Sequence, residues 1–259
     1  MATRNVNLTG MLEIMGVGAR RASAFMALGL RASDSDRISS FKIDTNFLYQ
    51  FMDDPVSDAV AIEVRANFSK WIIGNGLREL DQHFSMFLDE LYPALLGISN
   101  GAKVPDDFDS RMKSFTQVTN SSSKLSKLDN QFRIRSSAIQ HISSLSRVRN
   151  SFTHNLGRVS ERHRNSDAGL LISWQGMELT VGTKVIDGKF EPVHVEAGTE
   201  VSFGFIDRNK LIEIGNVIEL SPQELSEICM TYYFQSKELI GKTIEFAREN
   251  KVLVNEGTS

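Results

Sequence analysis

The chain contains few of the features that mark secreted or membrane proteins. Its 259 residues include one cysteine, Cys229, so no internal disulfide can form. A lone thiol fits a reducing compartment, and we therefore expect a cytoplasmic protein. Cys229 lies in an apolar helical pattern, where packing in the core is favoured over a role as nucleophile. No apolar run approaches the roughly 20 residues of a membrane-spanning helix, so we expect no membrane partner.

Patterns for metal and cofactor sites are missing as well. One cysteine and unpaired histidine spacing argue against zinc, and we expect neither a metal nor another cofactor. Gly16 and Gly18 do not form a dinucleotide fingerprint, because no strand precedes them and no third glycine follows. They resemble the turn of a helix-hairpin-helix element, which approaches nucleic-acid phosphates, but an ordinary helix break is favoured.

Charge is distributed unevenly along the chain. The net charge is −3, but residues 111–164 hold 11 Lys/Arg and two acids. This cationic segment carries +9, and the remaining chain, with 18 basic and 30 acidic residues, carries −12. A cationic region on an acidic body has the charge pattern of a phosphate-binding face. A solvated basic surface is the alternative, and charge alone does not separate the two.

Apolar residues at helical spacing predict several helices before residue 160. We expect them over 8–30, from residue 54 to Trp71, from Leu77 to just before Pro93, and from Ile139 to about Asn155. Gly74 and Gly76 would interrupt or kink the pattern between the second and the third. The polar segment 97–130 is expected to be mainly a connection, with one short helix near 106–118. Gly157 is placed to end the helix that contains Phe152.

The periodicity changes after residue 165. Alternating patterns between Gly-containing turns predict six short strands, at 170–174, 177–181, 184–186, 190–195, 200–206 and 210–219. Asp187-Gly188 is a strong hairpin signal, because both turn positions favour positive φ. Ser221-Pro222-Gln223-Glu224 then opens a last helix with a capping box.

The order of these elements predicts an α+β protein that is mainly α, with a small antiparallel β-meander inserted before the last helix. We divide the chain into an N-terminal helical segment (1–50), a helical bundle (51–160 and 221–250) and the β-meander insertion (165–220).

Three polar side chains cluster near the end of the Ile139–Asn155 helix. Asn150 and His154 lie four residues apart on nearly the same face, whereas Arg149 and His154 differ by about 140° around the axis. The long Arg149 side chain can swing toward that face. Arg149 can grip an anion, Asn150 can orient it, and His154 titrates near neutral pH. The three residues could therefore converge on one ligand.

The pattern Arg149-Asn150-x-x-x-His154 in a helical setting resembles the HEPN superfamily, whose motif is Arg-x4–6-His. The resemblance covers roughly 55–157 and 221–250 and implies an antiparallel helical bundle. Members are commonly metal-independent endoribonucleases of toxin–antitoxin or antiviral defence systems, and they act as dimers in which two motifs face one cleft. The resemblance also implies that an upstream helix contributes an acidic or polar residue. Glu79 and Asp81 are the candidates here, and a solvated helix face is the favoured alternative for both.

The resemblance implies RNA as the substrate, a homodimer, and an antitoxin or regulatory protein as a further partner. Arg149, Asn150 and His154 would be catalytic: His154 as acid or base, Arg149 on the phosphoryl oxygens, and Asn150 as the positioning group. The substrate-binding candidates are Arg147, Arg158, Arg162 and Arg164. Three alternatives remain open: residues that only cap the helix end, a nucleotide- or RNA-binding module without catalysis, and a regulatory scaffold whose β-meander recruits a partner.

Overall fold

A computed structural model describes residues 7–34, 57–182, 184–187 and 198–252 of the chain. Within these ranges six α-helices, one short 3-10 helix and a three-stranded antiparallel sheet form a mainly helical α+β fold, which confirms the predicted fold class. The predicted strand 190–195 and the boundary near residue 50 fall outside the described residues.

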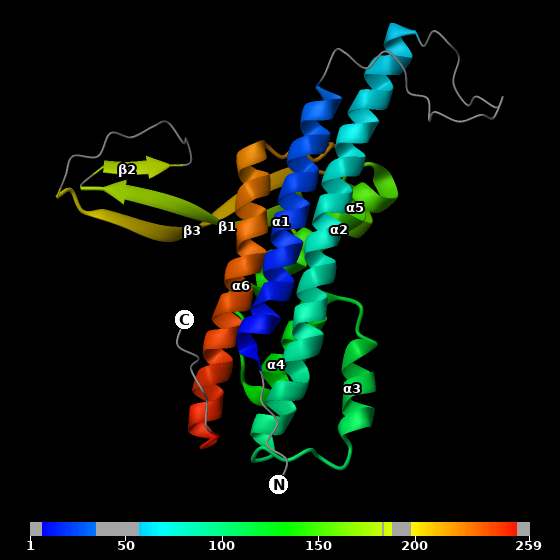
Figure 1. Ribbon diagram of the computed structural model, residues 1–259. Helices are drawn as coiled ribbons and strands as arrows, with labels where there is room; N and C mark the ends of the chain where they lie inside the picture. The colour runs from blue at the N-terminus through cyan, green and yellow to red at the C-terminus, as the bar shows by residue number, and fades with distance from the viewer. Residues whose placement is uncertain (1–6, 35–56, 183, 188–197, 253–259) are drawn as a thin grey trace, which may run out of the picture.

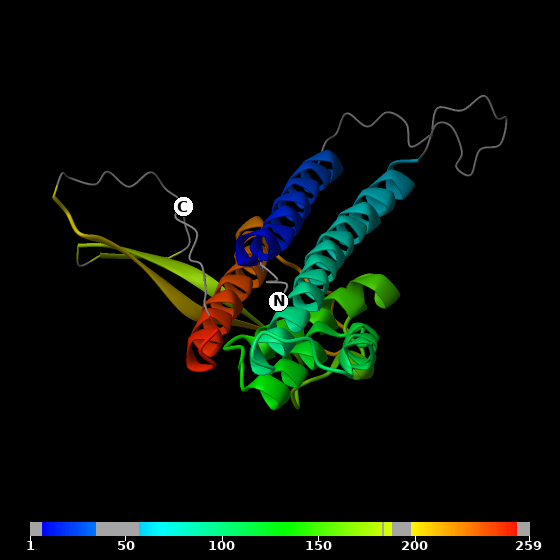
Figure 2. The same cartoon turned by 60° about the horizontal axis from the view of Figure 1, so that its bottom comes forward.

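Three long helices form the body of the molecule. They are α1 (Leu8–Ser33), α2 (Asp58–Ser99) and α6 (Pro222–Glu249). In both overall views α1 runs antiparallel to α2 and α6 (Figures 1 and 2). The capping box predicted at Ser221 is confirmed, because the Ser221 hydroxyl accepts from Glu224 N and the Glu224 carboxylate accepts from Ser221 N.

Glycines let α1 and α2 approach closely instead of breaking them. A Cβ on Gly18 would lie 2.4 Å from the Cβ of His83, and one on Gly76 would lie 2.5 Å from the Met26 side chain. The predicted interruption at Gly74 and Gly76 is therefore wrong, and so are both interpretations of Gly16 and Gly18, since α1 continues through them. Tertiary packing sets the role of these glycines.

The helix α2 also continues past the proline at which we expected it to end. Pro93 lies inside the helix, which reaches Ser99. A proline within a helix costs about 3 kcal/mol because it removes a hydrogen bond and crowds the preceding turn. Leu91, Leu95 and Leu96 around it are fully buried, so their packing offsets that cost.

Two short helices lie in the segment that we expected to be mainly a connection. The helix expected near 106–118 is α3 (Phe108–Thr116), and α4 (Ser121–Phe132) was not predicted. Leu125, Leu128 and Phe132 form a buried stripe along α4. The buried Lys124 ammonium donates to Asp89 at 2.6 Å and to Ser85 at 2.8 Å, so its charge is paired at the contact with α2.

The predicted helix before residue 157 is α5 (Ile139–Asn155), and its apolar stripe faces the core as expected. Leu156 and Gly157 follow with φ values of 48° and 79°, which reverse the chain in the left-handed region. The 3-10 helix η1 (Glu161–His163) comes next and leads into the sheet.

The sheet consists of β1 (Gly169–Val181), β2 (Lys184–Asp187) and β3 (Val201–Glu213), in the spatial order β2–β1–β3. The predicted antiparallel sheet before the last helix is confirmed. Its order differs from a simple meander, because the long β1 pairs along its whole length with β3 and only its end pairs with β2. We predicted two short strands on either side of Gly176 and two more on either side of residue 207. The structure has one continuous strand in each place, β1 and β3.

One end of the sheet joins the core and the other projects away from the helices (Figure 1). Leu170, Ile172 and Trp174 at the start of β1 are buried, whereas Phe203 and Phe205 on β3 are exposed. The Trp174 indole donates to Glu227 on α6 at 2.7 Å, which fixes the buried end of the sheet.

Candidate functional site

A glycine brings the predicted motif against α2. A Cβ on Gly74 would lie 2.8 Å from the Cβ of Phe152, so a larger residue would force α5 away from α2. Phe152 is buried, with 5% of its surface exposed. This contact fixes the last turns of α5 beside the middle of α2, with Arg149 before the contact and His154 after it.

Arg149 points toward α2 and forms an ion pair with Asp81. The Asp81 side chain is only 5% exposed, and its other oxygen accepts a hydrogen bond from Ser121 Oγ at 2.9 Å. Asn150 Oδ1 accepts from Arg149 Nη2 at 2.9 Å and from Nε at 3.2 Å. The solvated-face interpretation is therefore wrong for Asp81, which is the acidic partner of Arg149 on the upstream helix.

The ion pair lies against the buried core. Burial raises the pKa of the Tyr232 phenol well above its ordinary value, and the nearby Asp81 carboxylate raises it further while Arg149 opposes that rise. The Tyr232 phenol is therefore neutral where it borders the ion pair. Its weakly polar surroundings screen the charges less than water does, so the attraction between Arg149 and Asp81 stays strong.

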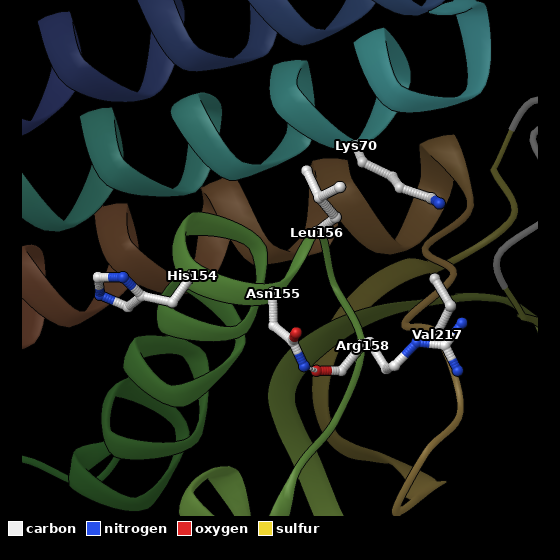
Figure 3. Close-up of a pocket in the computed structure, with 6 residues that line it drawn as sticks. All are labelled: Lys70, His154, Asn155, Leu156, Arg158 and Val217. Carbon is white, nitrogen blue, oxygen red and sulfur yellow. Dashed lines mark hydrogen bonds between the residues drawn. The ribbon is translucent and has the colours of Figure 1, made fainter. Parts of the chain in front are cut away.

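His154 lies about 7.5 Å further along the axis of α5 and is exposed. It lines a surface depression of about 340 Å³ together with Lys70, Asn155, Leu156, Arg158 and Val217. The imidazole points away from Lys70 and Arg158, which lie on the other side of the end of α5 (Figure 3). Among the described residues, no hydrogen bond or ion pair engages the His154 side chain, so it is open to solvent.

The structure brings Arg149 and Asn150 together and leaves His154 apart from them. The Arg149 guanidinium donates to Asp81 and Asn150. Within the described residues, no hydrogen bond links it to His154. Three of its five N–H groups are used in these bonds, and two remain. The Arg149 side chain is 23% exposed, so these two can still reach a ligand on the surface.

The four predicted substrate-binding arginines lie in two places. Arg158 borders the His154 depression and donates from Nη1 to the Gly215 carbonyl at 2.5 Å. Arg147 donates to the Arg164 carbonyl at 3.1 Å and so joins α5 to the segment around η1. Arg164 has acidic neighbours, Glu161 at 3.5 Å and Asp167 at 3.9 Å, and Arg162 is exposed beside His163.

His163 is a buried neutral group within this basic surface. Its side chain is nearly inaccessible, and its Nδ1 accepts from the Ser160 backbone N–H at 3.1 Å. Burial lowers the pKa of His163, and the charges of Arg162, His154 and Arg147 lower it further. Arg162, His154 and Arg147 therefore all lie close enough to this imidazole to act on it electrostatically.

Sequence reasoning missed Lys70 as a member of the site. Lys70 stands one helical turn before Gly74 on α2, in a segment with no motif of its own. Recognising it requires knowing that Gly74 packs against Phe152, which no local pattern shows. His141, at the start of α5, packs against the sheet, with its Nδ1 3.0 Å from Ser173 Oγ.

Comparison with protein-family models, with curated proteins and with solved structures gave no match to this chain. In the part of the chain that the structure describes, no three metal-binding side chains lie together, and no helix is long and apolar enough to cross a membrane.

Proposed function

We propose that this protein is a metal-independent endoribonuclease of the HEPN type that acts in toxin-like or antiviral defence. The observation that carries the proposal is the position of His154. This imidazole is exposed and unpaired within the described residues, and it lies at the edge of a depression that also holds Lys70 and Arg158. Cations hold phosphates, and an imidazole at the edge of the same depression can move the protons of a phosphoryl transfer.

The proposed reaction is attack of an RNA 2′-oxygen on the adjacent phosphorus. The bond from phosphorus to the 5′-oxygen breaks, which leaves a 2′,3′-cyclic phosphate and a free 5′-hydroxyl. His154 either takes the proton of the 2′-hydroxyl or gives a proton to the departing 5′-oxygen. Lys70 and Arg158 bind phosphates of the strand, and the two remaining N–H groups of Arg149 stabilise charge on the phosphoryl oxygens.

One imidazole cannot be base and acid in the same concerted step. A homodimer that places two His154 side chains at one cleft would supply both groups, which is the arrangement that the resemblance implies. We propose the dimer as the active form, with an antitoxin or regulatory protein as the partner that controls it. A mixed dimer of native and His154→Ala chains would then lose most of its activity.

Incubation of the full chain with RNA in excess EDTA tests the proposal. We expect cleavage with cyclic phosphate ends, and a loss of at least about a hundredfold in His154→Ala, because acid–base catalysis contributes that much or more. Since His154 is exposed, this substitution should change the free energy of unfolding by less than about 0.5 kcal/mol. Lys70→Ala should weaken RNA binding and make it less sensitive to salt.

A binding module without catalysis is the second candidate, because Arg149 is held by Asp81 and lies apart from His154. RNA binding that depends on Lys70, with no cleavage by either the native chain or His154→Ala, would establish that function and reject the nuclease. An active monomer would instead reject the two-motif cleft.

A further inference from the structure

A second depression lies on the outer surface of α1 and α2. It has a volume of about 550 Å³ and is lined by Arg21, Ala24, Phe25, Trp71, Asn75, Arg78, Glu79 and Gln82. On α2 the lining residues are at positions 71, 75, 78, 79 and 82, which form one helical stripe. That stripe lies between the face that meets α1 through Gly76 and the face that meets α5 through Gly74.

Exposed aromatic rings line one end of this outer depression. Trp71 is 54% exposed, and its ring centroid lies 6.2 Å from that of Phe25 and 6.1 Å from that of Phe68. The Phe68 ring is nearly parallel to the indole, at 17°, which holds the indole plane in place. An indole supported by neighbouring rings and open on its remaining surface is suited to stacking against a flat ligand.

Polar groups line the rest of the outer depression. Asn75 donates from Nδ2 to the Trp71 carbonyl at 2.8 Å, which leaves its Oδ1 available to a ligand. Gln82 and Arg78 are exposed, and within the described residues no ion pair engages Arg78. Arg21 is paired with Glu79 at 2.9 Å, so Arg78 supplies the available positive charge. This combination of a flat ring, an amide and a cation complements a base and its phosphate.

The outer depression adjoins the His154 site through α2. Lys70 borders the His154 depression, and the next residue, Trp71, borders the outer one. Consecutive Cα atoms are about 3.8 Å apart, and their side chains diverge by about 100° around a helix. A single strand that crosses α2 between these residues can therefore contact both depressions.

We infer that the outer depression holds an unpaired nucleotide, with the base stacked on Trp71 and the phosphate at Arg78. The inference rests on the proposed function, because it assigns the bound unit to the RNA strand that His154 cleaves. A purely apolar protein partner would leave Arg78, Asn75 and Gln82 facing it without complementary groups, which disfavours a protein interface here. The same stacking chemistry would also accept a free nucleotide.

Tryptophan fluorescence of the full chain provides the test. Trp174 is 2% exposed, so quenching by a bound base would come from Trp71. We would titrate the protein with a 2′-O-methyl oligonucleotide, which lacks the attacking hydroxyl, and separately with uridine and adenosine monophosphates. Quenching by the oligonucleotide alone identifies an RNA strand as the ligand, and quenching by the monophosphates identifies a free nucleotide. Quenching in either titration supports the site, and the absence of quenching in both titrations overturns it.

Substitutions give the second measurement, by anisotropy of a labelled oligonucleotide. Trp71→Leu should weaken binding of the oligonucleotide about tenfold or more, whereas Trp71→Phe should retain most of the affinity. Arg78→Gln should reduce the slope of log affinity against log salt concentration by about one, as expected for the loss of one phosphate contact. Phe203→Leu is the matched control, because Phe203 is 72% exposed on β3, away from α1 and α2, and should bind normally. Melting temperatures of all variants establish that they are folded.

Unchanged binding by folded Trp71→Leu would overturn the inference. So would conversion of a dimer to a monomer by this variant with normal RNA affinity, because the aromatic surface would then be a protein interface. The outcome for the proposed function is separate. Trp71-dependent binding without any cleavage rejects only the nuclease, and normal cleavage with Trp71-independent binding rejects only the nucleotide site.

Discussion

At the scale of single residues, the Arg149–Asp81 pair gives Arg149 a structural role as well as a proposed catalytic one. Arg149→Ala would leave the Asp81 carboxylate buried, with Ser121 as its one remaining partner among the residues that the structure describes. Loss of one partner of a buried pair costs about 3–5 kcal/mol, and partial exposure of Arg149 places the expected loss near the lower value. Urea unfolding of the variant measures this change.

A second substitution separates the two roles of Arg149. Asp81→Asn in the Arg149→Ala background removes the unpaired charge and keeps an acceptor for Ser121, so it should restore most of the lost stability. If RNA cleavage stays absent in this restored protein, Arg149 acts on the substrate. Recovery of cleavage together with stability would instead assign Arg149 to folding alone.

His163 makes stability depend on pH. Because burial and neighbouring cations lower its pKa below the ordinary 6.5, the folded protein keeps it neutral where the unfolded chain already binds a proton. As the pH falls below 6.5, His163 takes up a proton more readily in the unfolded than in the folded state, so its contribution to the free energy of unfolding decreases there and is constant at higher pH. Urea unfolding at several pH values, compared with His163→Gln, measures this effect. Equal slopes in both proteins would contradict it.

At the scale of secondary-structure elements, Gly74 determines how α5 meets α2. Alanine at this position would place its Cβ 2.8 Å from the Cβ of Phe152, which cannot move without its backbone. We expect the clash in Gly74→Ala to lower the free energy of unfolding by about 1–3 kcal/mol, which outweighs the gain in helix propensity from alanine. The variant should also cleave RNA more slowly, because the end of α5 is displaced.

The matched control for Gly74 is Gly241 on α6. A Cβ there meets nothing within 4 Å, so Gly241→Ala should stabilise the protein by about 0.5–1 kcal/mol and leave RNA cleavage unchanged. The two substitutions are chemically identical and should have opposite signs in urea unfolding. Stabilisation by both would show that α2 and α5 tolerate a wider separation.

Elements with local signals were predictable from the sequence, and those that depend on distant contacts were not. The capping box at Ser221 and the apolar stripe of α5 predicted their helices because the signal lies within the element itself. The continuity of α2 depends on contacts of Gly74 with Phe152 and of Gly76 with Met26, far away in the sequence. The helix α4 was not predicted because its segment is polar and rich in serine.

At the scale of the whole molecule, the same distinction holds for the site. The Arg149–Asn150–His154 motif could be found in the sequence because its members are within six consecutive residues. Asp81 lies 68 residues before Arg149 and Lys70 lies in a different helix from His154, so only the packing of α2 against α5 brings them into the site. The divergence of Arg149 and His154 also follows from this packing, since the strong attraction of Asp81 outweighs the freedom of a long side chain.

The depression beside His154 draws its walls from widely separated parts of the chain. Lys70 comes from α2, Arg158 follows α5, and Val217 follows β3. A ribosome producing this polypeptide would therefore have made more than two hundred residues before those walls could meet. The buried core is also incomplete until α6 emerges, because Leu225, Ile228 and Tyr232 form part of it. Between the synthesis of His154 and that of Val217, a nascent chain would thus carry the imidazole close to ribosomal RNA without the assembled surface that, on our proposal, cuts RNA.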